Sequence, residues 1–198
     1  MIVPRLVLLT DRTQLPAGRN LVETVRSCAG AWLSQVVVRE HDLGEEARHR
    51  LMTDLAAIDG LVVVSSRLPD PSAAGIHLAA DQISPDPGFG PGWFGAGWFG
   101  RSCHTVEEVH RAAAEGAAYA SLSPFAPSRS KPGYGPPVDR DAYAAAGDMP
   151  VLALGGIDPG NAAQARAAGA HGVAVMGAIM GAASPAAVVS RLLREVGA

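Results

Sequence analysis

In the stretch Ala168-Gly169-Ala170-His171-Gly172-Val173-Ala174-Val175, a residue pair that ends in glycine is directly followed by a short apolar run typical of a strand. Glycine is favoured just past a helix end because it adopts a left-handed backbone without steric cost. The same order occurs at three more places, Asp59-Gly60-Leu61-Val62-Val63-Val64, Ala74-Gly75-Ile76-His77-Leu78 and Glu115-Gly116-Ala117-Ala118-Tyr119. A repeated helix, glycine and buried strand is the unit of a parallel α/β barrel.

Four further apolar runs, at residues 5–10, 34–39, 98–102 and 151–154, bring the predicted strands to about eight, the number in a (β/α)₈ barrel. The runs lack polar alternation, so both faces of each strand are expected to be buried. The sequence therefore predicts an α/β fold, a single-domain (β/α)₈ TIM barrel spanning residues 1–198. Its third and fourth crossovers are expected to be short or irregular because residues 69–74 and 85–97 are brief or rich in Pro and Gly.

Three signals mark where helices begin between the strands. Thr105 with Glu108 three residues later forms a capping box, in which each residue satisfies a backbone N–H of the first helical turn. Asp158-Pro159 and Ser184-Pro185 each pair an N-cap residue with a proline suited to the first helical position. We expect helices to start at these three places.

Composition limits the classes of function. The chain has 198 residues, of which 48% are hydrophobic, and a formal net charge of −3. It shows no Lys/Arg cluster, so we expect neither nucleic acid nor a membrane surface as a partner. No apolar run is long enough for a membrane span and no leader pattern opens the chain, so a cytoplasmic protein is expected. Cys28 and Cys103 lack metal-site spacing, which predicts neither a zinc site nor a disulfide framework.

The C-terminal ends of the strands are where a barrel of this kind places its chemistry. Two glycine-bearing turns follow the last two strands, Leu154-Gly155-Gly156-Ile157 and Val175-Met176-Gly177-Ala178-Ile179. Their backbone N–H groups are expected to bind a phosphate through Gly155, Gly156, Gly177 and Ala178. The long loop from Ser123 to Pro137 is rich in hydroxyl groups and cations, and we expect it to clamp an anion through Ser128, Ser130 and Lys131.

Several motifs, in this order, resemble the thiamine phosphate synthase/TenI family: Arg39-Glu40, Gly75-Ile76-His77-Leu78, Ser102-Cys103-His104-Thr105, the loop 124–137, residues 155–162 and residues 172–179. The resemblance covers nearly the whole chain. It implies a (β/α)₈ barrel, a place in thiamine biosynthesis and a phosphorylated thiazole as the small-molecule partner. Arg39, Ser102, Ser128, Ser130 and Lys131 match positions that contact anions in the synthases.

The chain departs from the synthases at the positions that the resemblance assigns to Mg²⁺. The synthases hold this ion with aspartates, whereas Ser66 and Gln82 occupy the matching positions here. Val37 and His41 also replace a pyrimidine-facing Gln and a diphosphate-binding Lys. Mg²⁺ relies on carboxylate oxygens. We therefore expect no metal and no cofactor, with Mg²⁺ required only if the protein is a synthase after all.

These departures favour a TenI-like tautomerase, an isomerase that makes a carboxythiazole phosphate aromatic by proton transfer. Because histidine titrates near neutral pH, His104, His77 and His41 are the candidate bases, with Cys103 as a candidate acid. The first alternative is a divergent thiamine phosphate synthase, supported by Pro124, which stands where TenI proteins have a histidine. The second alternative is a non-catalytic sensor of a phosphorylated ligand. A homo-oligomer is left open.

Overall fold

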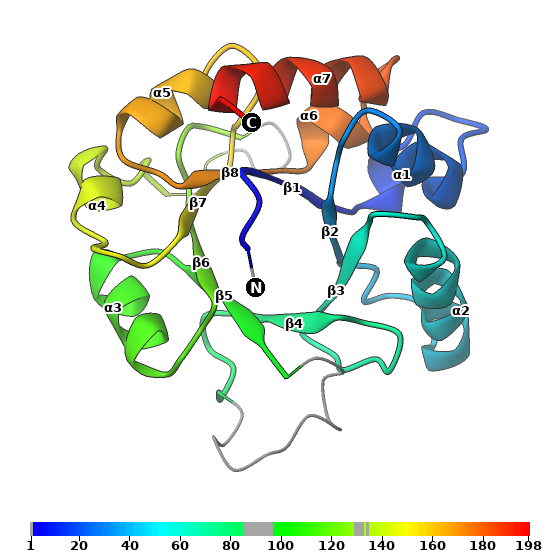
Figure 1. The fold of residues 1–198 in the computed structure, drawn as a ribbon, viewed down its shortest axis with the longest axis horizontal. Coiled ribbons are helices and arrows are strands. Elements are labelled where there is room, and N and C mark those ends of the chain that lie inside the picture. The colour runs from blue at the N-terminus through cyan, green and yellow to red at the C-terminus, as the bar shows by residue number, and fades with distance from the viewer. Residues whose placement is uncertain (1, 85–96, 129–132, 134) are drawn as a thin grey trace.

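The computed structural model describes residues 2–84, 97–128, 133 and 135–198. Eight parallel strands close into a barrel in which each strand pairs with the next and the last pairs with the first (Figure 1). The predicted barrel is confirmed. The strands are β1 (Leu6–Leu9), β2 (Gln35–Val38), β3 (Val62–Ser66), β4 (Gly75–Leu78), β5 (Phe99–Cys103), β6 (Tyr119–Leu122), β7 (Val151–Leu154) and β8 (Gly172–Val175).

Helices surround the ring of strands (Figure 1). They are η1 (Arg12–Gln14, a 3₁₀ helix), α1 (Leu21–Ala29), α2 (Glu45–Ala56), α3 (Val106–Ala114), α4 (Asp141–Ala144), α5 (Ala162–Ala167), α6 (Gly177–Met180) and α7 (Pro185–Val196). The segment from residue 67 to 74, which joins β3 to β4, contains no helix, so the expected short third crossover is confirmed. Most of the fourth crossover lies outside the described residues.

The glycines of the repeated motif have two different physical roles. Gly60, Gly116 and Gly169 have φ values of +74°, +82° and +100°, which is the left-handed conformation expected after a helix. Gly75 instead opens β4 and follows no helix. A Cβ placed on it would lie 2.6 Å from the Trp98 ring, so glycine is required there by packing, and the helix-end interpretation is wrong at this position.

The predicted helix starts are confirmed at two of three places. The Thr105 side chain accepts a hydrogen bond from the Glu108 N–H at the start of α3, and Pro185 follows the N-cap residue Ser184 at the start of α7. Asp158-Pro159 does not start α5, which begins three residues later, at Ala162. The Asp158 carboxylate accepts from the Gly160 N–H instead, which closes a local turn before the helix.

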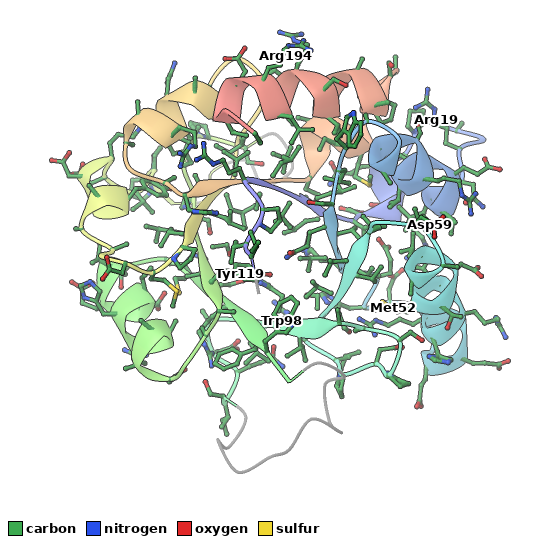
Figure 2. All side chains as sticks on the ribbon, in the orientation of Figure 1. Arg19, Met52, Asp59, Trp98, Tyr119 and Arg194 are labelled. Atoms are coloured by element: carbon green, nitrogen blue, oxygen red, sulfur yellow. The ribbon has the colours of Figure 1, made fainter. Side chains whose placement is uncertain are left out.

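The apolar core has two main parts. The larger part packs the outer faces of the strands against the helices and includes Met52 of α2. The smaller part fills the inside of the barrel with Val3, Val7, Val37, Tyr119 and Leu152 among others. Figure 2 shows Tyr119 toward the inside of the ring, whereas Arg19 and Arg194 lie at the periphery. Among the described residues, no helix has the length and apolar character needed to cross a membrane.

Candidate active site

A cavity of about 1050 Å³ opens where the strands end at their carboxyl side. Leu9, Ser66, Ser102, Leu154 and Val175, from five different strands, all line it. The cavity also contacts most of the residues predicted for the site, namely Arg39, His77, Ser102, His104, Ser128, Gly155, Gly156, Gly177 and Ala178. Barrel closure thus brings together residues that are more than a hundred positions apart in the sequence.

Gly155 and Gly156 form the turn after β7. Their φ values of +92° and +64° favour glycine, and a Cβ on Gly156 would lie 2.5 Å from the Ala126 carbonyl oxygen. The fold therefore requires Gly156 whether or not an anion binds. Neither N–H of this pair donates to any acceptor within the described chain, so both are available to a ligand in the cavity.

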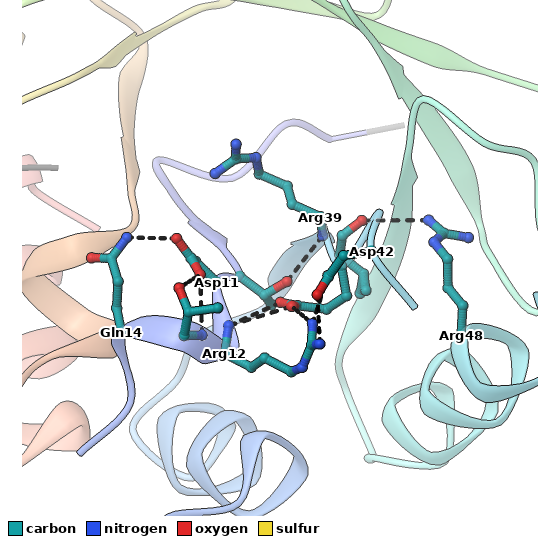
Figure 3. Close-up of polar contacts among 10 residues, drawn as sticks. Asp11, Arg12, Gln14, Arg39, Asp42 and Arg48 are labelled. Atoms are coloured by element: carbon teal, nitrogen blue, oxygen red, sulfur yellow. Dashed lines mark hydrogen bonds and ion pairs between the residues drawn. The ribbon is translucent and has the colours of Figure 1, made fainter. Parts of the chain in front are cut away.

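Arg39 follows β2 and extends its side chain over the cavity. Its backbone N–H donates to the Thr10 hydroxyl over 3.0 Å, which fixes where the side chain starts. Arg12 forms ion pairs with both neighbouring carboxylates, Glu40 at 3.0 Å and Asp42 at 2.6 Å. Figure 3 shows the Arg39 guanidinium pointing away from this network. It contacts the Met176 sulfur at 2.6 Å, and no carboxylate within the described residues forms an ion pair with it.

His77 lies inside the barrel with both ring nitrogens hydrogen-bonded. Its Nδ1 is 2.9 Å from the Tyr119 hydroxyl and its Nε2 is 2.9 Å from the Ser102 hydroxyl. Burial, together with the positive charges of Arg39, Arg101 and Arg67, lowers the pKa of His77 to about 4. The imidazole is therefore neutral at physiological pH, and no ring nitrogen is left to take a proton from a ligand.

The direction of this hydrogen-bond chain follows from the buried tyrosine. Burial raises the pKa of Tyr119, so its phenol keeps its proton and needs an acceptor. The acceptor within reach is His77 Nδ1, which places the imidazole proton on Nε2. Nε2–H then donates to the Ser102 oxygen. The Ser102 hydroxyl proton is left to donate into the cavity, which is the arrangement an anion needs.

Gly100 makes the contact between Tyr119 and His77 possible. In the barrel register, Gly100 pairs with His77 of β4 on one side and with Tyr119 of β6 on the other. A Cβ on Gly100 would lie 2.3 Å from the Tyr119 ring. The tyrosine therefore lies over the position of the missing side chain and reaches across β5 to the histidine.

The remaining predicted residues lie in different surroundings. His104 lines the cavity, with Nδ1 3.1 Å from the Ser123 carbonyl oxygen. His41 does not line it and borders a smaller pocket beside Asp11 and Asp42. Cys103 is fully buried in the outer core, and burial raises the pKa of its thiol to about 12, so the prediction of an acid at Cys103 is wrong. Ser130 and Lys131 lie outside the described residues.

Sequence reasoning missed three residues that shape the site. Arg67 directly follows β3 and lines the cavity, but its only signal was its place among the polar residues after a strand. Met176 holds the Arg39 side chain through its sulfur. Tyr119 orients His77, and this pairing depends on a strand register that the sequence alone does not provide.

A family model described as thiamine monophosphate synthase matches residues 6–179. The chain belongs to this family. The thiamine-phosphate synthase of Roseiflexus castenholzii is 33% identical to it, over 96% of this chain and 87% of the relative. That of Moorella thermoacetica is also 33% identical, over 93% of this chain and 91% of the relative.

A solved structure, thiamine phosphate pyrophosphorylase from Pyrococcus furiosus, superposes with a TM-score of 0.82 at 21% identity. It covers 98% of this chain and 95% of its own, which confirms the shared fold. The expectation of a TenI-like tautomerase is wrong, because relatives that match nearly the full length are named as synthases. Two of the predicted proton-transfer residues, His77 and Cys103, are buried, and both ring nitrogens of His77 are hydrogen-bonded.

Proposed function

We propose that this protein is a thiamine-phosphate synthase, a transferase that joins a pyrimidine methyl diphosphate to a thiazole phosphate. The observation that carries the proposal is full-length similarity to named synthases combined with a large cavity at the strand ends. The cavity has cationic, hydroxyl and backbone N–H groups on its wall, a set of donors that suits two phosphorylated substrates.

The bond changes define what the site must supply. The bond between the pyrimidine methylene carbon and the diphosphate oxygen breaks, and the bonding electron pair leaves with that oxygen. The thiazole ring nitrogen gives its lone pair to the methylene carbon and forms the new C–N bond. The products are thiamine phosphate and pyrophosphate. Because no proton has to move at the reacting atoms, catalysis rests on positioning and on neutralising the leaving charge.

We assign the thiazole phosphate to the glycine turns. The N–H groups of Gly155 and Gly156, which have no acceptor among the described residues, border the cavity, and Gly177 and Ala178 line it from the end of β8. Ser128 adds a hydroxyl group from the loop after β6. Ser130 and Lys131, which match anion-contacting positions of the synthases, remain predicted ligands.

We assign the pyrimidine diphosphate to the side of the cavity formed by β2, β3 and β5. Arg39 supplies a guanidinium without a carboxylate partner among the described residues, and Ser102 supplies the hydroxyl proton that His77 directs toward the cavity. His77 and Tyr119 act as positioning residues in this proposal. The uncharged hydrogen-bond chain from Tyr119 through His77 keeps the Ser102 hydroxyl directed at the anion without adding a base.

The described donors do not fit a magnesium ion held by the protein. Asp81 and Asp158 are the acidic residues in the described cavity lining, and Asp158 already accepts the Gly160 N–H. The Gln82 side chain, at the expected aspartate position, is hydrogen-bonded to the Ala79 N–H and to the Arg67 carbonyl. Within the described chain, no group of three His, Cys, Asp or Glu side chains is placed to hold a metal ion.

The test is an assay of the purified protein with both substrates, separating thiamine phosphate by chromatography. We expect product when both substrates are present and none when either is left out. Binding of thiazole phosphate without any product would contradict the proposal and would favour a non-catalytic ligand-binding protein.

A further inference from the structure

The position that was expected to hold a metal carboxylate has another structural role in this chain. The Gln82 Oε1 accepts the Ala79 N–H at 2.8 Å, and its Nε2 donates to the Arg67 carbonyl at 3.0 Å. The Arg67 N–H in turn donates to the His77 carbonyl at 2.9 Å. Both backbone groups of Arg67 are thus held, and Gln82 holds one of them.

Arg67 has a backbone conformation that requires such support. Its φ of +62° lies in the left-handed region, which costs a residue with a Cβ of order 1 kcal/mol. Arg67 adopts this unfavourable conformation at the end of β3, beside the cavity. The conformation sets the direction in which the Arg67 side chain leaves the backbone. A strained residue at the rim of a cavity is a candidate for a ligand contact.

A second arginine secures the loop that carries Gln82. Arg101, buried in β5, donates through Nη1 to the Ala79 carbonyl at 3.1 Å and to the Gln82 carbonyl at 2.6 Å. It also forms an ion pair with Glu115 at 3.0 Å. The charge of Arg101 is therefore balanced, and its role is to fix residues 79–82. The Arg67 turn is held by a loop that is itself anchored.

The charges at the cavity differ in how far they are balanced. Within the described chain, neither Arg67 nor Arg39 forms an ion pair with a carboxylate, whereas Arg12 and Arg101 do. Both unbalanced guanidinium groups line the same cavity, and the positive charges of both lower the pKa of buried His77. Asp81, also on the wall, offers one carboxylate against two cations. This side of the cavity favours a polyvalent anion without a metal.

We infer that Arg67, held in place by Gln82, binds the diphosphate together with Arg39 and neutralises it in place of a protein-held magnesium ion. The inference rests on the proposed function and extends it to the leaving group. As the C–O bond breaks, the electron pair and the new charge remain on the diphosphate oxygen, which two guanidinium groups can bind by charge-assisted hydrogen bonds. Ser66, at the end of the same strand, supplies no carboxylate that would compete for the arginines.

The test measures binding of inorganic pyrophosphate by calorimetry, in EDTA and in excess MgCl₂. We expect binding in EDTA that is equal to or tighter than binding with Mg²⁺, because the metal competes with the arginines for the same oxygens. Arg67→Gln should weaken binding in EDTA about tenfold or more, and Arg67→Lys should restore part of the loss. Binding that requires Mg²⁺ would overturn the inference.

Two further variants serve as controls. Asp81→Asn removes one of the two carboxylates in the described cavity lining, and we expect it to leave pyrophosphate binding unchanged or to tighten it; weaker binding in MgCl₂ would overturn the inference. Arg191→Gln removes an exposed cation of α7 that does not line the cavity, and it should bind pyrophosphate as the wild type does.

The synthase assay separates this inference from the proposed function. Product formation that persists in EDTA supports both. Product formation that stops in EDTA overturns the metal-independent subsite and leaves the synthase function standing. Pyrophosphate binding in EDTA by a protein that makes no thiamine phosphate contradicts the function and supports the cationic subsite.

Discussion

His77 shows how a residue of ambiguous chemistry acquires a definite role through its surroundings. A histidine after a barrel strand is a reasonable candidate base when only its sequence is known. In the structure its two nitrogens are occupied by Tyr119 and Ser102, and burial among arginines lowers its pKa to about 4. The same side chain therefore directs a hydrogen bond and does not accept a proton. Sequence alone could not decide this, because both partners come from other strands.

The pH dependence of the free energy of unfolding should reveal the lowered pKa of the buried His77. Its folded pKa of about 4 lies below the unfolded value near 6.5, so the unfolded chain binds a proton first as pH falls. The free energy of unfolding should therefore decrease through this group between pH 6.5 and pH 4, by about 2 kcal/mol from pH 7 to pH 5. Urea titrations of the wild type and of His77→Gln measure it. Equal pH slopes in the two proteins would contradict the assignment.

Tyr119→Phe tests the direction of the hydrogen-bond chain. Loss of the phenol removes the donor to Nδ1 and lets the imidazole proton move there, which reverses the bond to Ser102. We expect pyrimidine diphosphate to bind about fivefold more weakly, the effect of one hydrogen bond of about 1 kcal/mol. Nitrogen NMR of His77 should show Nε2–H in the wild type and a mixture in the variant. An Nδ1–H signal in the wild type would refute the proposed direction.

Gly100 of β5 lies between the two strands that carry His77 and Tyr119, so its size affects the site. The inside of the barrel at this level holds the Tyr119 ring, and a Cβ on Gly100 would overlap it at 2.3 Å. Gly100→Ala should therefore destabilise the fold by about 1–3 kcal/mol through overpacking and separate Tyr119 from His77. Gly30→Ala is the matched control, since its Cβ would make ordinary contacts of 3.5 Å at a φ of −61°. The midpoints of thermal unfolding of the Gly100→Ala and Gly30→Ala proteins are compared; equal midpoints would contradict the packing argument.

Elements were predictable from the sequence where local chemistry determines them. Left-handed glycines after helices and the Thr105 cap depend on neighbours in the chain, and both are present in the structure. The role of Gly75 was not predictable, because the Trp98 ring that excludes a side chain there belongs to another part of the chain. The start of α5 was also missed, because Asp158 closes a turn and does not cap the helix.

At the scale of the whole molecule, barrel closure turns separate motifs into one cavity. Most of the predicted site residues line this cavity, because the strand ends of a parallel barrel share one face. The sequence did not reveal that Gln82 would fix the Arg67 turn, so the loss of a carboxylate suggested the loss of synthase chemistry. In the structure, Arg39 and Arg67 line the cavity, and a relative that matches 96% of the chain is named a thiamine-phosphate synthase.

The most direct measurement is phosphorus NMR of the purified protein mixed with pyrimidine methyl diphosphate and thiazole phosphate. If the protein is a synthase, the diphosphate signals decline while thiamine phosphate and pyrophosphate appear in equal amounts. Unchanged substrate spectra, or pyrophosphate released without thiamine phosphate, would contradict the transferase account.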